Sequence, residues 1–289
     1  MTSGLVQLGK AGRPAADLSF GHTLAPNDRA AFARHVLLFT SGKGGVGKST
    51  VAVNVASALA QRGLAVGLLD ADVHGPSVPR MLGLADERVR WGADDRMIPA
   101  ENFGLKVMSV GLTTPEADTP LVWRASVATS ALVQLVEDVA WGPLDVLCVD
   151  LPPGTGDVQL TMAQELRVSG AIVVTTPQAV ATDDVRRAIR MLQESRVPVT
   201  GVVENMSSFV TPDGGVHHPF GQGGGRMLAE AYGVPFLGEL PLDPGIREAS
   251  DEGRPIAATG TEAQRVHFVA LASAIVAGLG LTPREEQTP

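Results

Sequence analysis

Residues 42–49 limit the possible folds of this chain more than any other part of its sequence. They read Gly-Lys-Gly-Gly-Val-Gly-Lys-Ser and follow the apolar run 36–39. The segment fits the pattern G-x-x-x-x-G-K-[ST] completely, with glycines where the backbone must approach an anion closely. Successive N–H groups of such a loop point into one hollow, and a helix that begins near Lys48 adds its positive dipole end. The segment therefore predicts a buried strand, a phosphate-binding loop and a helix, in that order.

The residues of this loop have different expected roles. Lys48 can reach the β- and γ-phosphates of a nucleotide, and the hydroxyl of Ser49 can bind Mg²⁺. Lys43 is a second lysine inside the loop, and its ammonium group would place a further point charge near the phosphates. The alternatives are a glycine-rich turn without a ligand and a solvated Lys43. The residues expected to contact the nucleotide here are Gly42, Lys43, Gly44, Gly45, Val46, Gly47, Lys48, Ser49 and Thr50.

Apolar runs alternate with helical patterns from residue 36 onward. The predicted strands are 36–40, 65–69, 105–110, 145–149, 170–175, 199–203 and 235–239. The predicted helices are about 49–61, 126–140, 179–194, 222–231 and 261–277. Most of the strands are almost entirely apolar, as expected for parallel strands that are covered on both faces. The alternation predicts an α/β protein with a doubly wound, mostly parallel sheet flanked by helices.

The length of the chain suits one large core. It has 289 residues, of which 44% are hydrophobic. Residues 1–34 and 281–289 carry little periodicity, and we expect them to form a flexible N-terminal leader and a flexible tail. Residues 35–280 are expected to form the nucleotide-binding domain.

Composition argues against several classes of function. The net charge is −8, whereas a nucleic-acid-binding protein usually carries a basic surplus. The sequence shows neither an apolar run of roughly 18–20 residues, nor a secretory signal, nor an amphipathic tail, so we expect no membrane partner. The single cysteine, Cys148, lies in a predicted buried strand and is expected to be an inert core thiol. A cytoplasmic protein in a reducing compartment is expected.

Aspartates follow two of the predicted strands. Asp70 and Asp72 come after the second strand, and Asp150 follows the fourth. Ligands of parallel sheets bind at the carboxyl ends of the strands, so these carboxylates should face the phosphate loop. We expect Asp150 to bind Mg²⁺ together with Ser49, and Asp72 to position the water that attacks the γ-phosphate. Asp70 would hold a Mg²⁺-bound water or orient the loop, and helix capping is the alternative for both Asp70 and Asp72.

The base of the nucleotide needs a second set of contacts. Asn205 follows the sixth predicted strand, and its amide offers both a donor and an acceptor, which suits the edge of adenine. Pro241 and Asp243 follow the seventh strand and could flank the base. The alternative for Asn205 is a side chain that caps a turn.

Six segments together make the chain similar to a known family. It resembles the Mrp/nucleotide-binding-protein family of P-loop ATPases, which are iron–sulfur cluster carriers related to MinD and ParA. The segments are Ser-Gly-Lys-Gly-Gly-Val-Gly-Lys-Ser-Thr, Leu-Asp-Ala-Asp-Val-His-Gly-Pro-Ser, Val-Asp-Leu-Pro-Pro-Gly-Thr-Gly-Asp-Val-Gln-Leu, Val-Val-Glu-Asn-Met-Ser, Phe-Gly-Gln-Gly-Gly-Gly and Ile-Arg-Glu-Ala-Ser.

The resemblance implies ATP hydrolysis by a homodimer. In the MinD/ParA/Mrp class, the extra lysine of the deviant loop reaches across the dimer to the nucleotide of the partner subunit. By resemblance, Lys43 would make catalysis depend on dimerisation, and Lys43, Lys48 and Asp72 would be the catalytic residues. ATP and Mg²⁺ are the implied cofactors. Iron–sulfur apoproteins or another protein client are the implied partners.

One element of the family is missing from this chain. The family carries a Cys-x-x-Cys motif after the Glu-Asn-Met-Ser element, and those cysteines hold a cluster between two subunits. Thr211 and Gly214 stand at the matching positions here. Cluster irons prefer thiolate ligands, so a bound iron–sulfur cluster is doubtful. His217 and His218 lie nearby as candidate ligands of a divalent metal, with solvent-facing histidines as the alternative.

Two functions therefore remain in view. The first is an ATP-hydrolysing, Mrp-type iron–sulfur cluster carrier or assembly ATPase that acts as a nucleotide-gated homodimer. The second is a cluster-free, ATP-dependent protein-interaction switch of the MinD/ParA class. A reductase of the nitrogenase iron-protein type is not favoured, because it too would need subunit-bridging cysteines.

Overall fold

A computed structural model describes residues 30–113 and 125–282, so most of the predicted leader and tail lies outside the described residues. An eight-stranded sheet with the order β12-β9-β8-β1-β7-β2-β6-β5 forms its centre. Its strands are β1 (Ala33–Ser41), β2 (Val66–Asp70), β5 (Ala100–Asn102), β6 (Leu105–Ser109), β7 (Leu144–Asp150), β8 (Gly170–Thr175), β9 (Val199–Glu204) and β12 (Phe236–Glu239). Only β5 is antiparallel to its neighbour, at one edge of the sheet. The prediction of a mostly parallel sheet is confirmed.

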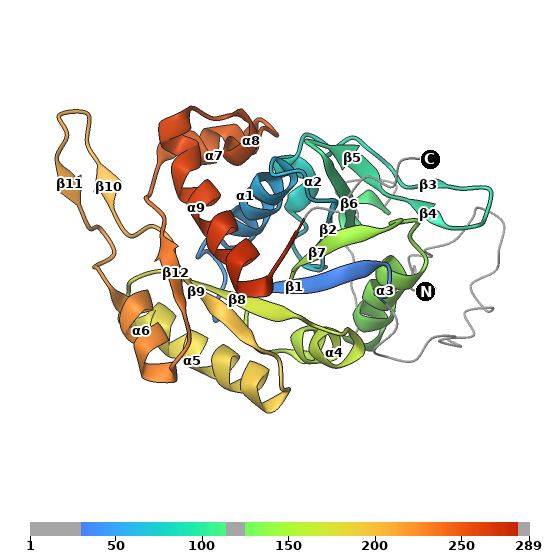
Figure 1. The fold of residues 1–289 in the computed structure, drawn as a ribbon, viewed down its shortest axis with the longest axis horizontal. Helices are drawn as coiled ribbons and strands as arrows, with labels where there is room; N and C mark the ends of the chain where they lie inside the picture. The colour runs from blue at the N-terminus through green and yellow to red at the C-terminus, as the bar shows by residue number, and fades with distance from the viewer. Residues whose placement is uncertain (1–29, 114–124, 283–289) are drawn as a thin grey trace, which may run out of the picture.

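Helices cover both faces of this sheet (Figure 1). One face carries α1 (Lys48–Ala60), α2 (Val78–Met81), α7 (Pro244–Asp251), α8 (Ile256–Thr259) and α9 (Glu262–Leu279). The opposite face carries α3 (Ala125–Glu137), α4 (Asp157–Glu165), α5 (Ala179–Glu194) and α6 (Gly224–Tyr232). The fold is therefore doubly wound, and each parallel strand is followed by a connection to one face or the other.

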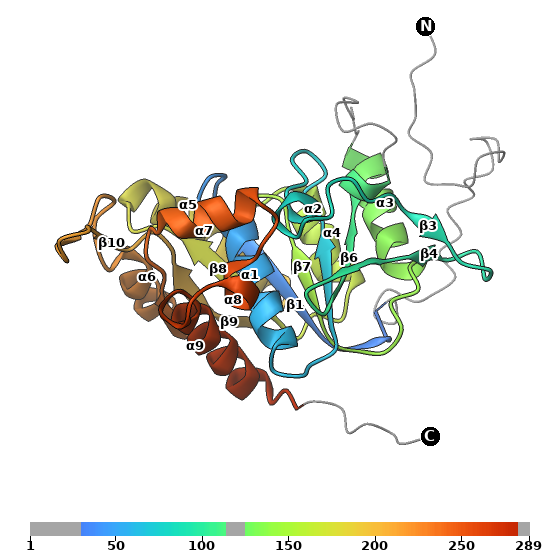
Figure 2. The same ribbon diagram turned by 90° about the horizontal axis from the view of Figure 1, so that it is seen from above.

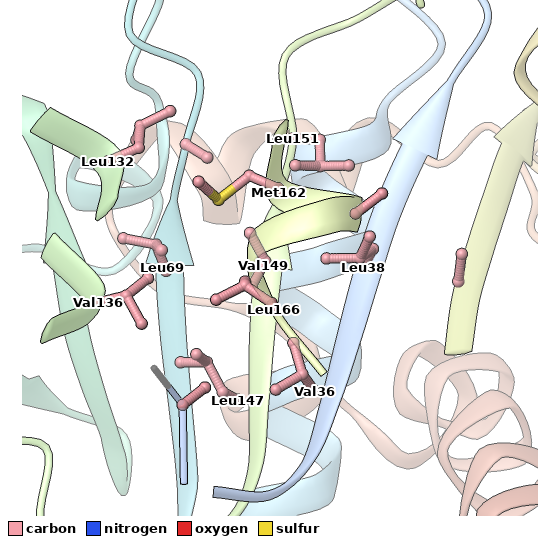
Figure 3. Close-up of a cluster of buried hydrophobic side chains, with 14 of the residues drawn as sticks. Val36, Leu38, Leu69, Leu132, Val136, Leu147, Val149, Leu151, Met162 and Leu166 are labelled. Carbon is pink, nitrogen blue, oxygen red and sulfur yellow. The ribbon is translucent and has the colours of Figure 1, made fainter. Parts of the chain in front are cut away.

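Alternate side chains of the central strands enter two separate cores. Val36 and Leu38 of β1 pack with Leu132 and Met162 of the helices α3 and α4, as Figure 3 shows. Their neighbours in β1, Leu37 and Phe39, point to the other face and pack among residues of α1 and α9. Because both faces are buried, β1 must be apolar at almost every position. This arrangement explains why unbroken apolar runs in the sequence predicted the strands.

Short elements were not predicted. They include α2, α4, α7 and α8, and two small antiparallel ribbons, β3–β4 (Arg90–Trp91 with Met97–Ile98) and β10–β11 (Phe209–Val210 with Val216–His217). The ribbons project from opposite ends of the molecule (Figure 1). The helices α2 and α8 and the strands of both ribbons have only two to four residues, too few to repeat a helical or alternating pattern, so periodicity does not reveal them. The helices α4 and α7 are longer, with nine and eight residues, but they bury few side chains and so lack an extended apolar stripe. Among the described residues, no helix is long and apolar enough to cross a membrane.

Candidate nucleotide-binding site

The phosphate-binding loop joins β1 to α1 at the carboxyl edge of the sheet, along the upper side of Figure 2. Gly47 precedes α1 in the left-handed conformation, with φ of 82°, and no side chain caps the helix. The N–H groups in the first turn of a helix lack partners within the helix, so these groups are available to an anion. Gly45 also has a positive φ, of 79°. The local geometry is therefore that of an anion-binding loop, as the sequence predicted.

Glycines of the loop also permit close packing against other elements. At Gly42, a Cβ atom would lie 2.4 Å from the carbonyl carbon of Asp184 and 2.4 Å from the nitrogen of Val185, both in α5. At Gly47, a Cβ atom would lie 2.2 Å from Nδ2 of Asn205. By contrast, a Cβ atom at Gly44 would meet nothing closer than 3.9 Å. Gly42 is thus required by its packing against the backbone of α5, and Gly47 by its positive φ and the nearby side chain of Asn205.

Lys48 and Asp150 form a buried ion pair beneath the loop. Their Nζ and Oδ1 atoms lie 2.6 Å apart, and their side chains are 6% and 0% exposed. Nζ of Lys48 also lies 3.2 Å from Oγ of Ser49. Burial raises the pKa of the Asp150 carboxyl, and the nearby Lys48 ammonium opposes that shift. The second carboxylate oxygen of Asp150 is buried without a hydrogen-bond partner, so it has a free acceptor site for Mg²⁺ or Mg²⁺-bound water.

Asp70 lies beside Asp150, because β2 and β7 are neighbours with these two residues in register. Its carboxylate accepts hydrogen bonds from Oγ of Ser109 at 3.1 Å and from the N–H groups of Asp72 at 3.2 Å and Val78 at 3.3 Å. Burial, and then the charge of Asp150, raise the pKa of Asp70 to about 8. The contact with Val78 is at the first residue of α2, so Asp70 both orients the following loop and caps a helix.

Asp72 lies in a cavity of about 200 Å³ together with the phosphate-binding loop. Lys43, Ser77 and Pro153 are also in the wall of this cavity. The structure thus places all three residues that were expected to be catalytic, Lys43, Lys48 and Asp72, in the wall of one cavity. Lys43 and Asp72 are only partly buried, so a reacting group or a second molecule can reach them.

A second cavity, of about 260 Å³, adjoins the first. The two share Gly47, Thr50 and Met81 in their walls. All three residues that were predicted to contact the base line the second cavity, namely Asn205, Pro241 and Asp243. A compartment lined by the glycine-rich loop, Lys43 and Asp72 therefore continues into a more apolar compartment of the kind that binds small ligands.

Two of these predicted base contacts also have structural roles. Nδ2 of Asn205 donates a hydrogen bond to the carbonyl oxygen of Val46, at 2.8 Å, and so holds the phosphate-binding loop. Oδ1 of Asp243 accepts from the N–H of Gly245 at 2.7 Å and caps α7. The alternative of a capping side chain therefore applies to Asp243 more directly than to Asn205.

Several residues of the base cavity were not predicted. They come mainly from α7, α9 and the short helix α2, which fold over the end of α1. These residues are Met81, Met206, Leu240, Leu242, Ile246, Arg247, Ser250, Asp251 and Phe268. The Ile-Arg-Glu-Ala-Ser segment had been singled out in the sequence, but nothing in its composition indicated a contact with a base.

The residues that bear on metal or cluster binding are the single cysteine and the side chains of the β10–β11 ribbon. Cys148 is 0% exposed in β7, and burial raises the pKa of its thiol to about 12. At the tip of the β10–β11 ribbon, Thr211 and Gly215 are joined by a backbone hydrogen bond of 2.8 Å. Both His217 and His218 are exposed, and Nδ1 of His218 lies 2.6 Å from the carbonyl oxygen of Ser207. In the described part of the chain, no three His, Cys, Asp or Glu side chains are grouped to hold a metal.

Comparison with known proteins agrees with this geometry. The family model described as ParA, the NUBPL iron-transfer P-loop NTPases, matches residues 33–276. A solved structure of a nucleotide-binding protein from Archaeoglobus fulgidus in complex with ADP is similar, with a TM-score of 0.70 and 37% sequence identity. The match covers 79% of this chain and 90% of that one.

Two relatives are both named iron-sulfur cluster carrier protein. The one from Aquifex aeolicus is 51% identical over 224 residues, which is 77% of this chain and 62% of that protein. The one from Deinococcus radiodurans is 54% identical over 223 residues, or 77% of this chain and 63% of that protein. The chain thus spans slightly less than two thirds of the length of each relative.

Proposed function

The chain belongs to the family of NUBPL iron-transfer P-loop NTPases, and on that premise we propose that it hydrolyses ATP to ADP and phosphate. Nucleotide binding is a property of this family, and the site described above has a phosphate compartment and a base compartment. Beyond nucleotide binding, we propose that the nucleotide is ATP, that it is hydrolysed, and that a second subunit takes part. Turnover is expected to be slow, because the complete site forms only when two subunits meet.

The cluster of Lys48, Ser49 and Asp150 carries this proposal. Its members lie within 3.2 Å of Nζ of Lys48, at the start of α1 and next to the cavity that contains Lys43 and Asp72. In the proposed complex, a phosphate replaces Asp150 as the partner of Lys48. Asp150 and Ser49 are then free to hold Mg²⁺, which neutralises charge on the transferring phosphoryl group. Asp72, which also lines the cavity, would orient the attacking water.

Asn205 supports adenine as the base. One N–H of its Nδ2 atom is donated to the carbonyl oxygen of Val46, which fixes the orientation of the amide, and its oxygen remains as an acceptor. The exocyclic amino group of adenine is a donor, whereas guanine carries a carbonyl at the same position. In the proposed complex the amide oxygen faces this position of the base, where it accepts from adenine and would repel the carbonyl of guanine.

A homodimer completes the proposed enzyme. Gly44 and Gly45 are exposed at the carboxyl edge of the sheet, and Lys43 next to them is partly exposed. A second copy that meets this edge can receive the ammonium group of Lys43 on its own nucleotide. In this arrangement ATP links two subunits, and hydrolysis releases them.

Two lysine variants test the proposal. Lys48→Ala removes the main phosphate contact, so we expect loss of ATP binding and a fall in turnover on the order of 100-fold or more. Lys43→Ala should still bind ATP but lose both hydrolysis and ATP-dependent dimerisation. Phosphate release, ATP affinity and the mass of the particle in solution are the measurements. The control is Arg190→Ala, at an exposed position of α5.

The outcomes separate the parts of this proposal. Full turnover by Lys48→Ala would show that the site is wrongly assigned. If the protein hydrolyses ATP as a monomer and Lys43→Ala does not change its turnover, the proposed ATPase activity stands and the proposed dimer is wrong.

For the biological role, we propose iron–sulfur cluster assembly, as the names of the relatives suggest, with iron–sulfur apoproteins as clients. A cytoplasmic location belongs to this proposal, and the free thiol of Cys148 supports a reducing compartment.

One observation favours a second candidate, a cluster-free switch in which ATP controls binding to another protein. The only cysteine of the chain, Cys148, is completely buried in the central sheet. Iron–sulfur clusters are held by thiolates, and this chain has none at its surface. On this view, the ATP site is retained, and the conformational change acts on a protein client without cargo.

A further inference from the structure

The loop between β7 and α4 connects the Mg²⁺ end of the site to the rest of the molecule. It starts directly after Asp150, and its N–H groups bind the end of β1 at two points. Leu151 donates to the carbonyl oxygen of Phe39 at 3.1 Å, and Gly154 donates to that of Ser41 at 2.9 Å. Pro153, between these two anchors, lines the phosphate cavity. The position of this short segment therefore affects both Asp150 and the space for the γ-phosphate.

Gln159 holds the same segment from the other side. It lies in the first turn of α4, and its side chain is 1% exposed. Its Nε2 atom donates a hydrogen bond to the carbonyl oxygen of Pro152, at 2.7 Å. A carbonyl oxygen only accepts hydrogen bonds, so the amide nitrogen must face it. A Cβ atom placed on Gly156 would lie 3.4 Å from Oε1, so the amide of Gln159 reaches across the loop to its far end.

The buried amide of Gln159 provides the hydrogen-bond donor for the carbonyl oxygen of Pro152. An apolar residue of the same size would leave the buried carbonyl of Pro152 without its partner. The rest of the loop has few constraints of its own, because Pro153, Thr155, Gly156 and Asp157 are exposed. Gly156 also precedes α4 without a side-chain cap. The bond from Gln159 is thus the link through which α4 holds the segment that follows Asp150.

We propose that Gln159 is a positioning residue for ATP hydrolysis. It fixes the carbonyl of Pro152, and thereby the placement of Asp150 and Pro153 around the γ-phosphate and its Mg²⁺. It touches neither the nucleotide nor the reacting water. The inference rests on the proposed ATPase activity and adds a residue to which nothing in the sequence motif assigned a role.

The test compares two substitutions at Gln159 with a matched control on the same helix. Gln159→Met keeps the length of the side chain and removes the donor, and Gln159→Glu keeps the shape but cannot donate when ionised. We expect both to lower kcat by roughly 10- to 100-fold, because small misplacements of reacting groups cost rate steeply. ATP affinity should remain within about two-fold, since the phosphate-binding loop is untouched. Gln164→Met, at an exposed position of α4, should match the wild-type protein.

The readouts distinguish positioning from a general structural role. Thermal unfolding is measured for each variant, and if Gln159→Met does not fold, Gln159→Glu decides the question. A folded variant with unchanged kcat would overturn the inference, and so would one whose loss lies in ATP affinity alone. If the wild-type protein itself does not hydrolyse ATP, the proposed function fails first, and that result is separate from any comparison of variants.

Discussion

At the scale of single residues, two buried carboxylates share one nearby lysine. Asp70 and Asp150 are adjacent in the sheet, and Lys48 forms its ion pair with Asp150. Asp70 instead has neutral partners, Ser109 and two backbone N–H groups. Burial is the main cause that raises the pKa of Asp70, and the like charge of Asp150 adds to it because neighbouring carboxylates disfavour each other's ionisation. The sequence showed where the two carboxylates stand, but it did not show that Asp150 has a charged partner and Asp70 only neutral ones.

The raised pKa of Asp70 predicts a pH dependence of stability. Its usual value is 3.8 and its value in the folded protein is about 8. Between roughly pH 4 and pH 8, the folded protein therefore holds a proton that the unfolded chain has released. The free energy of unfolding should then fall as the pH rises through this range, by at most about 1.4 kcal/mol per pH unit from this group.

Asp70→Asn replaces the acid with a neutral group and should flatten this decline. The measurement is urea unfolding at a series of pH values between about 5 and 8. Asp157→Asn, at an exposed carboxylate, serves as the control and should keep the wild-type slope. Equal slopes for the wild-type protein and Asp70→Asn would mean that Asp70 is ionised in the folded state.

At the scale of elements, the strand, loop and helix around residues 42–49 form as predicted, because local rules specify them. Apolar residues drive the strand into the sheet, and glycines with positive φ turn the chain into α1. The packing of Gly42 against α5 involves a helix more than 130 residues away in sequence. Such a contact is invisible to periodicity and motif patterns.

This contact predicts a difference between two glycines of one loop. Gly42→Ala places a methyl group against the backbone of α5, which cannot yield as a side chain can. Overpacking of this kind costs about 1–3 kcal/mol of unfolding free energy, and the displaced loop should also weaken ATP binding. Gly44→Ala is the matched control for unfolding, because its added carbon has room. Chemical unfolding of both variants and ATP titration of Gly42→Ala are the measurements, and equal losses of unfolding free energy at the two positions would contradict the packing argument.

At the scale of the whole molecule, the surroundings of Cys148 and of the β10–β11 ribbon bear on whether the protein can hold an iron–sulfur cluster. Cys148 pairs in register with Leu37 of β1 and Leu68 of β2, so it lies in the middle of the sheet. Its side chain packs in the core between the sheet and the helices α1 and α9, so a metal cannot reach its sulfur unless this helical layer moves. Thr211 and Gly214, which stand at the positions of the missing cysteines, are joined by a backbone hydrogen bond of 2.9 Å that closes the turn.

We therefore expect no stoichiometric cluster on this protein alone. Iron and acid-labile sulfide are measured after anaerobic reconstitution of the full chain, with Cys148→Ser alongside. Both proteins should bind ATP and contain only background iron. Stoichiometric iron and sulfide in the wild-type protein would show that a cluster is held. Their loss in Cys148→Ser would show that the buried thiol becomes accessible, and retention would show ligands other than cysteine.

Much of this protein was already determined by local sequence. Apolar runs specify strands because both faces of a parallel sheet are buried, and the glycines of 42–49 specify the turn from β1 into α1 because Gly45 and Gly47 adopt a positive φ that other residues avoid. Other features depend on contacts between segments that are distant in the chain. Folding places α2, α7 and α9 over the base cavity, directs Asn205 onto the loop and joins Gln159 to Pro152. The reason is physical, since a side chain acquires its partners and its pKa from neighbours that assemble only in the folded protein.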